Sequence, residues 1–219
     1  MGQTYQAVVF DMDGVIFDSE RLIIECWKET ADKYSIEDIE RACEACLGVN
    51  AVETREIFED IYGQDFPYDE YKKEMSEMYH SLYDGGRLPT KVGVKELLQF
   101  LKAQGKKVGL ASSTRSVVVR QELTDAGLIE YFDVVVGGDM VSRSKPQPDI
   151  FLKACEELGV APQDAFAIED SYNGIRAAAA GKLRPIMVPD LMPVTKEMQG
   201  LAEYIFETLV DVRNFLKQM

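Results

Sequence analysis

Strand-like and helix-like segments alternate along the chain from residue 89 to about residue 188, and this alternation constrains the fold more than any other feature of the sequence. Runs rich in branched and apolar residues predict strands at 107–112, 132–137, 165–170 and 184–188. Helical patterns around 97–102, 117–126, 151–158 and 175–180 lie between them. Such alternation predicts right-handed crossovers and a parallel sheet that helices cover on both faces.

A further strand is predicted close to the N-terminal end. Residues 5–10 are apolar and β-branched enough for a buried parallel strand, and Asp11-Met12-Asp13-Gly14 follows directly. Two carboxylates therefore emerge at the carboxyl edge of a strand, where open α/β sheets bind their ligands. Because two neighbouring acids repel each other, a cation or a proton is needed to offset the repulsion. We therefore treat the pair as a candidate functional site.

The segment between the first strand and the rest of the sheet has a different character. Apolar side chains recur at helical spacing from residue 19 to about residue 83 and predict four helices, with breaks at Gly48, Gly63 and Pro67. The glycine-rich segment 84–89 that follows is suited to a hinge. The sequence thus predicts a doubly wound, Rossmann-like α/β core formed by residues 1–18 and 89–219, and an inserted α-helical cap domain formed by residues 19–88.

The net charge and the cysteine content limit the possible partners and the cellular location of the protein. The chain has 38 acidic and 24 basic side chains and a formal net charge of −14, which argues against binding to nucleic acids or anionic membranes. Four cysteines without a recognisable signal peptide favour a cytoplasmic protein, and we assign Cys43-x-x-Cys46 to packing. No apolar run is long enough to span a bilayer. A monomer is the default expectation.

Polar side chains gather at or just beyond four of the predicted strand ends. The four clusters are Asp11 with Asp13, Ser112 with Ser113 and Thr114, Ser144-Lys145-Pro146, and Glu169-Asp170. The carboxyl ends of parallel strands share one edge of a sheet, so these side chains should form one site. Carboxylates from the first and last clusters form an all-oxygen environment that suits Mg²⁺, with room left for a phosphate.

These four clusters resemble, in order and position, the four motifs of the haloacid dehalogenase-like hydrolase superfamily, in its β-phosphoglucomutase-like branch. The matching residues are Asp11-x-Asp13-Gly14-Val15, the strand-terminal Ser112, Lys145-Pro146 and Glu169-Asp170. The resemblance covers essentially the whole chain, including the place of the helical cap. It implies phosphoryl transfer through an aspartyl-phosphate with the help of magnesium.

The resemblance also implies roles for individual residues. Asp11 is the expected nucleophile, Asp13 the general acid and base, and Lys145 the cation that screens the repulsion between a carboxylate and a phosphate. Ser112, with backbone N–H groups at a helix start around Ser113 and Thr114, is expected to bind phosphate oxygens. The expected metal ligands are Asp11, the backbone carbonyl of Asp13, and Asp170. Glu169 is expected to act on the metal directly or through a water in its shell.

Each cluster alone also has a simpler interpretation. Asp-x-Asp-Gly is often only a turn, Ser171 is a good helix cap after Glu169-Asp170, and a lysine before proline is usually solvated. The coincidence of all four at strand ends favours a catalytic site. A serine-hydrolase reading of Ser112 fails because His80, the only histidine, lies in the insert and is expected near the surface or the hinge.

The cap is expected to decide between phosphatase and mutase. The sugar phosphomutases that the chain resembles carry Ser-Arg after the segment matching 47–49, where this chain has Asn50-Ala51, and a histidine where it has Ile23. We therefore favour a magnesium-dependent phosphatase acting on a small phosphorylated metabolite, such as a sugar phosphate or pyrophosphate. A sugar phosphomutase, with Arg55 replacing the missing arginine, remains the alternative. A non-catalytic phosphometabolite-binding protein is the third possibility, although such a protein has no need of Asp11.

Candidate substrate contacts in and near the cap complete the predictions. They are Glu20, Asn50, Arg55 and Asn173. Glu20 could instead pair with Lys145. Trp27 is a further candidate, but its place on an amphipathic helix favours a position in the core.

Overall fold

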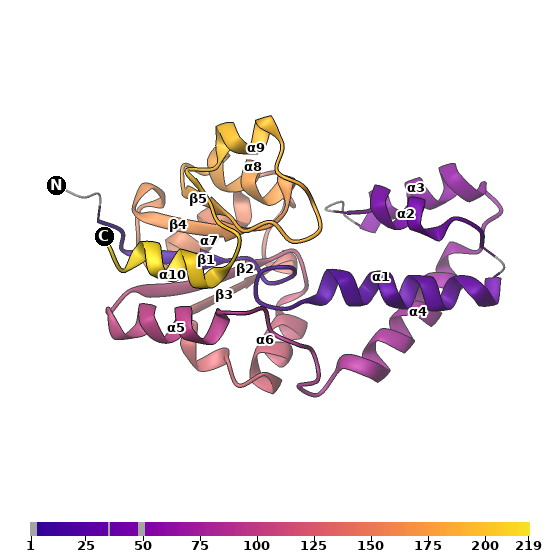
Figure 1. Cartoon of the computed structure of the whole chain (residues 1–219), viewed down its shortest axis with the longest axis horizontal. Coiled ribbons are helices and arrows are strands. Elements are labelled where there is room, and N and C mark those ends of the chain that lie inside the picture. The colour runs from indigo at the N-terminus through magenta and orange to yellow at the C-terminus, as the bar shows by residue number, and fades with distance from the viewer. Residues whose placement is uncertain (1–3, 35, 48–50) are drawn as a thin grey trace.

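A parallel sheet forms the centre of the molecule. A computed structural model describes residues 4–34, 36–47 and 51–219, and within them six strands have the order β3-β2-β1-β4-β5-β6, with every neighbouring pair parallel. The strands are β1 (Ala7–Phe10), β2 (Lys107–Ser112), β3 (Val134–Gly137), β4 (Ala165–Glu169), β5 (Arg184–Met187) and β6 (Tyr204–Ile205). The predicted parallel α/β sheet is confirmed (Figure 1).

Helices cover both faces of this sheet. They are α5 (Val94–Ala103), α6 (Ser116–Asp125), α7 (Asp149–Leu158), α8 (Tyr172–Ala180), α9 (Lys196–Leu201) and α10 (Leu209–Leu216). Successive strand residues point to opposite faces. In β1, Val8 and Phe10 accordingly pack in the cluster that contains α5 and α10, whereas Ala7 and Val9 pack in the cluster that contains α7 and α8. The doubly wound, Rossmann-like class is therefore confirmed.

Three elements at the C-terminal end were not predicted. The strand β6 has two residues, both half-buried, which is too short for a periodic pattern. The helices α9 and α10 follow threonine N-caps, Thr195 and Thr208, whose side chains accept hydrogen bonds from backbone N–H groups of the first turn. A threonine at each of these positions is a sequence signal for a helix start, from which the two helices could have been predicted.

Among the described residues, four α-helices lie between β1 and α5 and form a separate lobe. They are α1 (Ser19–Ala31), α2 (Ile39–Ala45), α3 (Ala51–Tyr62) and α4 (Tyr68–Tyr83). Trp27 anchors the centre of this lobe: its ring lies 4.9 Å from the rings of both Phe58 and Tyr71, and its carbonyl accepts a hydrogen bond of 2.5 Å from the Tyr71 hydroxyl. Trp27 is 8% exposed, so the core interpretation holds.

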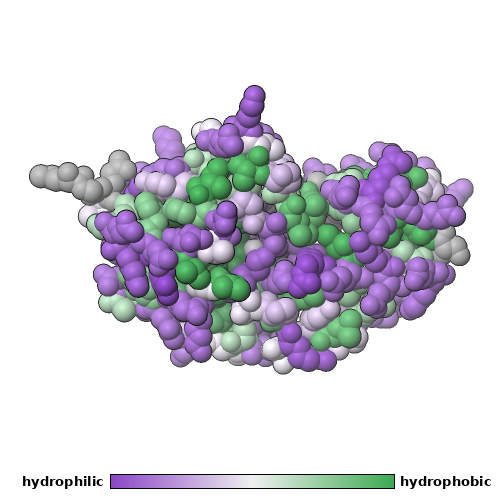
Figure 2. Space-filling view, in the orientation of Figure 1, coloured by the Kyte–Doolittle hydropathy of each residue, from purple (hydrophilic) through white to green (hydrophobic). Residues whose placement is uncertain are grey.

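Two adjacent backbone segments connect the helical lobe to the sheet. Phe17 forms a β-bridge with Thr90, and the N–H of Asp18 donates a hydrogen bond of 3.0 Å to the carbonyl of Pro89. The domain boundaries predicted at residues 18 and 89 lie at this crossing and remain a prediction. Hydrophobic side chains show on the surface where the two lobes face each other, while the outside of the helical lobe is mostly hydrophilic (Figure 2). Within the described ranges, no helix combines the length and apolarity needed to cross a membrane.

Candidate active site

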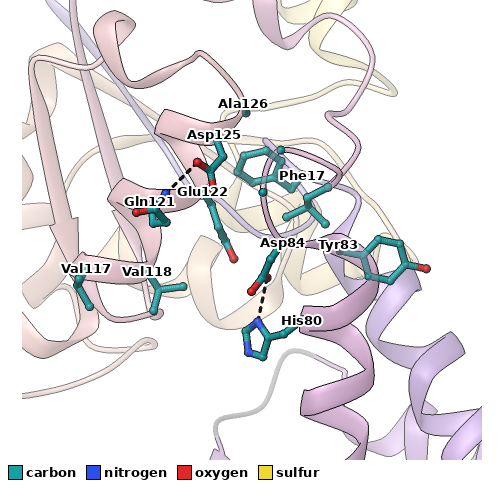
Figure 3. Close-up of a pocket in the computed structure, with 13 residues that line it drawn as sticks. Phe17, His80, Tyr83, Asp84, Val117, Val118, Gln121, Glu122, Asp125 and Ala126 are labelled. Carbon is teal, nitrogen blue, oxygen red and sulfur yellow. Dashed lines mark hydrogen bonds and ion pairs between the residues drawn. The ribbon is translucent and has the colours of Figure 1, made fainter.

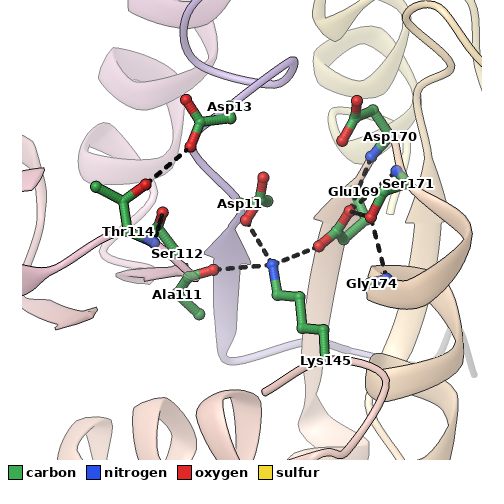
Figure 4. A network of polar contacts seen from close by, with 10 residues as sticks. All are labelled: Asp11, Asp13, Ala111, Ser112, Thr114, Lys145, Glu169, Asp170, Ser171 and Gly174. Atoms are coloured by element: carbon green, nitrogen blue, oxygen red, sulfur yellow. Dashed lines mark hydrogen bonds and ion pairs between the residues drawn. The ribbon is translucent and has the colours of Figure 1, made fainter. Parts of the chain in front are cut away.

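The four predicted clusters meet at the carboxyl edge of the sheet (Figure 4). In the sheet register, Phe10 of β1 lies between Leu110 of β2 and Ile168 of β4. The residues that follow these positions, including Asp11, Ser112 and Glu169, therefore emerge side by side. Lys145 reaches the same place from the loop between β3 and α7.

Lys145 links the first and last clusters. Its Nζ donates hydrogen bonds to Asp11 Oδ1 at 2.5 Å, to Glu169 Oε1 at 2.6 Å and to the carbonyl of Ala111 at 3.2 Å. Burial lowers the pKa of Lys145, but the carboxylates of Asp11 and Glu169 outweigh this effect and the net shift is upward. Lys145 is therefore a fixed, permanently charged cation beside Asp11.

Glu169 is held on both carboxylate oxygens. Its Oε2 accepts hydrogen bonds from the N–H groups of Asp170 and Ser171 at 3.1 Å and from Ser171 Oγ at 2.9 Å. Ser171 also caps α8 by accepting a hydrogen bond of 3.0 Å from the N–H of Gly174, as its sequence position predicted. A side chain at Gly174 would overlap the Glu169 carboxylate, so the helix approaches this closely only with glycine. These contacts make Glu169 an anchor for Lys145.

A group of buried carboxylates is suited to a cation. Oxygens of Asp11, Glu169 and Asp170 lie within 4.8 Å of one another. Burial raises the pKa of Asp11, which Lys145 partly opposes, and burial together with Glu169 raises the pKa of Asp170. A divalent cation would relieve this repulsion, and oxygen donors of this kind fit Mg²⁺. The donor set is therefore compatible with the predicted metal.

Gly14 brings the loop after β1 against the last cluster. Its φ angle is +74°, and a Cβ at this position would overlap the carboxylate of Asp170. The glycine of the Asp-x-Asp-Gly motif thus does more than form a turn. It allows Asp170 to lie against the backbone that carries Asp11 and Asp13.

Asp13 is oriented by two hydroxyl groups. Ser19 Oγ donates to Asp13 Oδ1 at 2.6 Å, and Thr114 Oγ1 donates to Asp13 Oδ2 at 3.3 Å. Burial raises the pKa of Asp13 and these two hydrogen bonds lower it, with a net upward shift. An aspartate of raised pKa can carry the proton that the predicted general acid requires. Ser19 is not among the site residues that the sequence pattern predicts.

The segment after β2, which is predicted to bind phosphate, lies just before helix α6. Helix α6 begins at Ser116, so Ser113 and Thr114 lie in the loop before the helix and not at its start. The N–H of Thr114 donates to Ser112 Oγ at 3.1 Å, and the side chain of Thr114 reaches Asp13. The helical pattern predicted around 117–126 agrees with the observed helix, whereas Ser113 and Thr114 precede its first residue.

Glu20 belongs to a second acidic group at the same edge. Carboxylate oxygens of Glu20, Asp170 and Asp190 lie within 4.8 Å of one another. Burial, followed by the nearby Asp13 and Asp190, raises the pKa of Glu20 to about 7. Lys145 is bonded to Asp11 and Glu169, so the considered pairing of Glu20 with Lys145 is not formed. Asp190 was missed, although it closely follows β5 and obeys the same strand-end rule.

The remaining cap candidates lie in other surroundings. Arg55 forms ion pairs with Asp69 and Glu59, and its guanidinium lies 4.7 Å from the centre of the Tyr68 ring. Asn173 accepts a hydrogen bond of 3.1 Å from Arg176. Asn50 lies outside the described residues.

A cavity of about 310 Å³ lies at the junction of α4, the segment after it, and α6 (Figure 3). His80 bonds Asp84 at 2.9 Å beside this cavity, close to the hinge segment as expected. The carboxylate of Glu122 also faces it, and its Oε2 is buried with no hydrogen-bond partner among the residues that the structure describes. Burial, followed by Asp13 and Asp84, raises the pKa of Glu122 to about 7.

Comparison with known proteins agrees with this geometry. The sequence model of the haloacid dehalogenase-like hydrolase family matches residues 8–188. The chain belongs to this family. The match includes all four clusters that meet at the sheet edge.

Relatives in the haloacid dehalogenase-like hydrolase family include phosphatases and a phosphomutase. The chain is 33% identical over 181 residues to a phosphorylated carbohydrates phosphatase of Thermotoga maritima, covering 83% of each chain. It is 31% identical to β-phosphoglucomutase of Bacillus subtilis, covering 85% of this chain and 88% of the relative. The crystal structure of CbbY from Rhodobacter sphaeroides in complex with phosphate is similar at a TM-score of 0.76 and 28% identity, covering 95% and 96% of the two chains. Family membership with β-phosphoglucomutase-like relatives confirms the resemblance seen in the sequence.

Proposed function

We propose that the protein is a magnesium-dependent phosphatase that hydrolyses a small phosphomonoester through an aspartyl-phosphate on Asp11. The observation that carries this proposal is the position of Asp11, which is bonded to Lys145 on one side and lies within 4.8 Å of Asp170 on the other. A carboxylate in this position can approach a phosphate dianion, because Lys145 and the proposed Mg²⁺ screen the repulsion between the carboxylate and the phosphate.

The first step transfers the phosphoryl group to the protein. An oxygen of Asp11 forms a bond to phosphorus as the bond between phosphorus and the ester oxygen breaks. Asp13 gives its proton to that leaving oxygen, which departs as the alcohol. Ser19 and Thr114 hold the Asp13 carboxyl in place for this transfer.

The second step regenerates the enzyme. Asp13, now ionised, takes a proton from water as the water oxygen bonds to phosphorus. The bond between phosphorus and Asp11 breaks, which restores the carboxylate and releases inorganic phosphate. Dividing one difficult displacement into two steps lowers each barrier.

Asp11, Asp170 and the backbone carbonyl of Asp13 would hold Mg²⁺ at this edge. The bound cation supplies charge that offsets repulsion between phosphate and carboxylates. Glu169 supports the site through Lys145 and the backbone of Asp170.

Phosphatase activity is favoured over mutase activity by the pairing of Arg55 in the helical lobe. A mutase must retain a bisphosphate while it turns over, which calls for a second phosphate-binding cation. Arg55, the candidate replacement, is occupied by Asp69 and Glu59. The carbohydrate phosphatase among the relatives supports a phosphorylated metabolite as substrate.

Phosphate release from a panel of phosphomonoesters and pyrophosphate, with and without Mg²⁺, tests the proposal. We expect release that requires Mg²⁺, together with competitive inhibition by beryllium fluoride, which mimics a phosphoryl group on a carboxylate. A protein that binds phosphoesters without releasing phosphate would be a binding protein. Isomerisation of a hexose phosphate in the presence of its bisphosphate, without hydrolysis, would establish the mutase instead.

A further inference from the structure

The helical lobe contains a cavity of about 300 Å³ that the reaction steps above do not use. Helix α1 contributes one stripe of side chains to it: Glu20, the adjacent Ile23 and Ile24 one turn later, and Trp27 a further turn on. Phe58 and Met75 from α3 and α4 complete the apolar walls. The cavity is therefore lined largely by aromatic and aliphatic surface, as is usual for pockets that bind organic molecules.

Glu20 connects this cavity to the catalytic edge. It lines the cavity, and its carboxylate lies within 4.8 Å of that of Asp170. An oxygen of Asp170 also lies within 4.8 Å of one of Asp11. A phosphate ester attacked by Asp11 can therefore extend its organic part past Glu20 into the helical lobe.

Tyr68 lies in the wall of the cavity, and its hydroxyl lacks a partner in the described part of the chain. The residue is 2% exposed, and its hydroxyl oxygen is buried. Buried hydroxyl groups are normally paired, because leaving one unpaired is destabilising. The hydroxyl has almost no accessible surface, so a ligand in the cavity can supply its partner after a small shift of the Tyr68 ring.

Lys72 adds a cation to the same wall. Its Nζ lies 5.8 Å from the centre of the Tyr68 ring, and no carboxylate among the described residues forms an ion pair with it. Lys72 and the Tyr68 hydroxyl can together receive an anionic or hydrogen-bond-accepting group. Apart from Glu20, Thr54, Tyr68 and Lys72, the residues that line the cavity are largely apolar and offer few side-chain partners to the several hydroxyl groups of a sugar, which would lose hydration on entry.

We infer that this cavity binds the leaving group and makes the enzyme selective for phosphomonoesters of aromatic or largely apolar alcohols that carry an anionic or hydrogen-bond-accepting group. The inference rests on the proposed phosphatase function. It names Tyr68 and Lys72 as the polar determinants of specificity, and the stripe on α1 as the apolar wall.

Three esters of primary alcohols test the selectivity at similar intrinsic reactivity: 4-carboxybenzyl phosphate, benzyl phosphate and glucose 6-phosphate. Acetyl phosphate, whose organic part is too small to fill the cavity, reports on the chemistry at Asp11 alone. We expect kcat/KM to be about tenfold or more higher for 4-carboxybenzyl phosphate than for glucose 6-phosphate, with benzyl phosphate between them. Hydrolysis of acetyl phosphate without this order would overturn the cavity assignment and leave the phosphatase intact. No hydrolysis of any of the four would contradict the phosphatase itself.

Two variants then assign the polar contacts. Tyr68→Phe should lower the ratio of kcat/KM for 4-carboxybenzyl phosphate to that for acetyl phosphate about tenfold, without lowering the melting temperature, because the hydroxyl has no partner in the protein. Lys72→Met should abolish the advantage of 4-carboxybenzyl phosphate over benzyl phosphate. Lys73→Met is the matched control, since Lys73 is exposed, does not line the cavity and pairs with Glu77. Ratios that stay at wild-type values in both test variants would disprove the roles of Tyr68 and Lys72.

Discussion

The hydroxyl of Ser19 donates a hydrogen bond of 2.6 Å to Asp13. Ser19 is the first residue of α1, so the acid that would move the proton is bonded directly to the start of the helical lobe. The orientation of Asp13 therefore depends on where that lobe lies relative to the sheet.

Replacement of Ser19 by alanine should change catalysis through Asp13. Loss of a hydrogen bond that lowers the pKa of Asp13 will raise that pKa further, so the alkaline limb of the kcat profile should move to higher pH. Loss of orientation should also lower kcat, by about tenfold. Profiles of kcat against pH for Ser19→Ala and Thr114→Val provide the measurement, with the smaller effect expected for Thr114, whose hydrogen bond is longer. Superimposable profiles for wild type and both variants would rule out the orienting role.

Replacement of Asp11 by asparagine should remove the nucleophile at nearly constant volume. Turnover should fall by about 10³-fold or more, while the circular dichroism spectrum is unchanged. Asp65→Asn, at an exposed position in the helical lobe, is the matched control and should retain wild-type activity. Substantial turnover in Asp11→Asn would mean that another group attacks phosphorus.

Replacement of Lys145 by methionine should damage both activity and stability. The change keeps much of the side-chain volume but leaves Asp11 and Glu169 buried without their cation. Breaking a buried pair in this way usually destabilises a fold by about 3 kcal/mol or more. Urea unfolding measures the loss, and added Mg²⁺ should recover part of it by replacing the missing charge. Stability equal to wild type in the absence of Mg²⁺ would show that the carboxylates do not depend on Lys145.

Glu122 should make stability depend on pH. Its pKa in the folded protein is about 7 against an ordinary value of 4.5, so the folded state holds this proton more tightly than the unfolded state. Stability from this group is therefore fully present below about pH 4.5 and is lost as the pH rises through 7. Glu122→Gln should be more stable than wild type at pH 8, by about 1 kcal/mol after allowance for partial solvent screening, and equal to it near pH 4.5. Chemical unfolding at the two pH values checks this, and a constant difference would exclude titration of Glu122 as the cause.

The site residues that could be predicted from the sequence are those that follow the ends of strands. Asp11, Ser112, Glu169 and Asp170 follow segments whose apolar, branched composition identifies them as buried strands, and parallel strands bring their carboxyl ends to one edge. The contact partners of these residues were harder to predict. Ser19 bonds to Asp13 across the start of a helix, and Thr114 turns its side chain to Asp13 because helix α6 begins only at Ser116.

In the helical lobe, sequence predicted the helices but not the contacts between their polar side chains. Helical spacing identified its four segments and the core position of Trp27, since burial of an apolar stripe leaves a clear pattern. The pairing of Arg55 with Asp69 and the unpartnered hydroxyl of Tyr68 depend on how the helices pack against one another. No spacing rule in the sequence reports such contacts.

Gly14 and Asp170 are 156 residues apart in the sequence, yet the absence of one methyl group sets how near they come. Alanine at position 14 would push the Asp170 carboxylate away from Asp11, and its first effect would fall on cation affinity. The smallest residue of the site thus sets the distance between the two carboxylates that would bind magnesium.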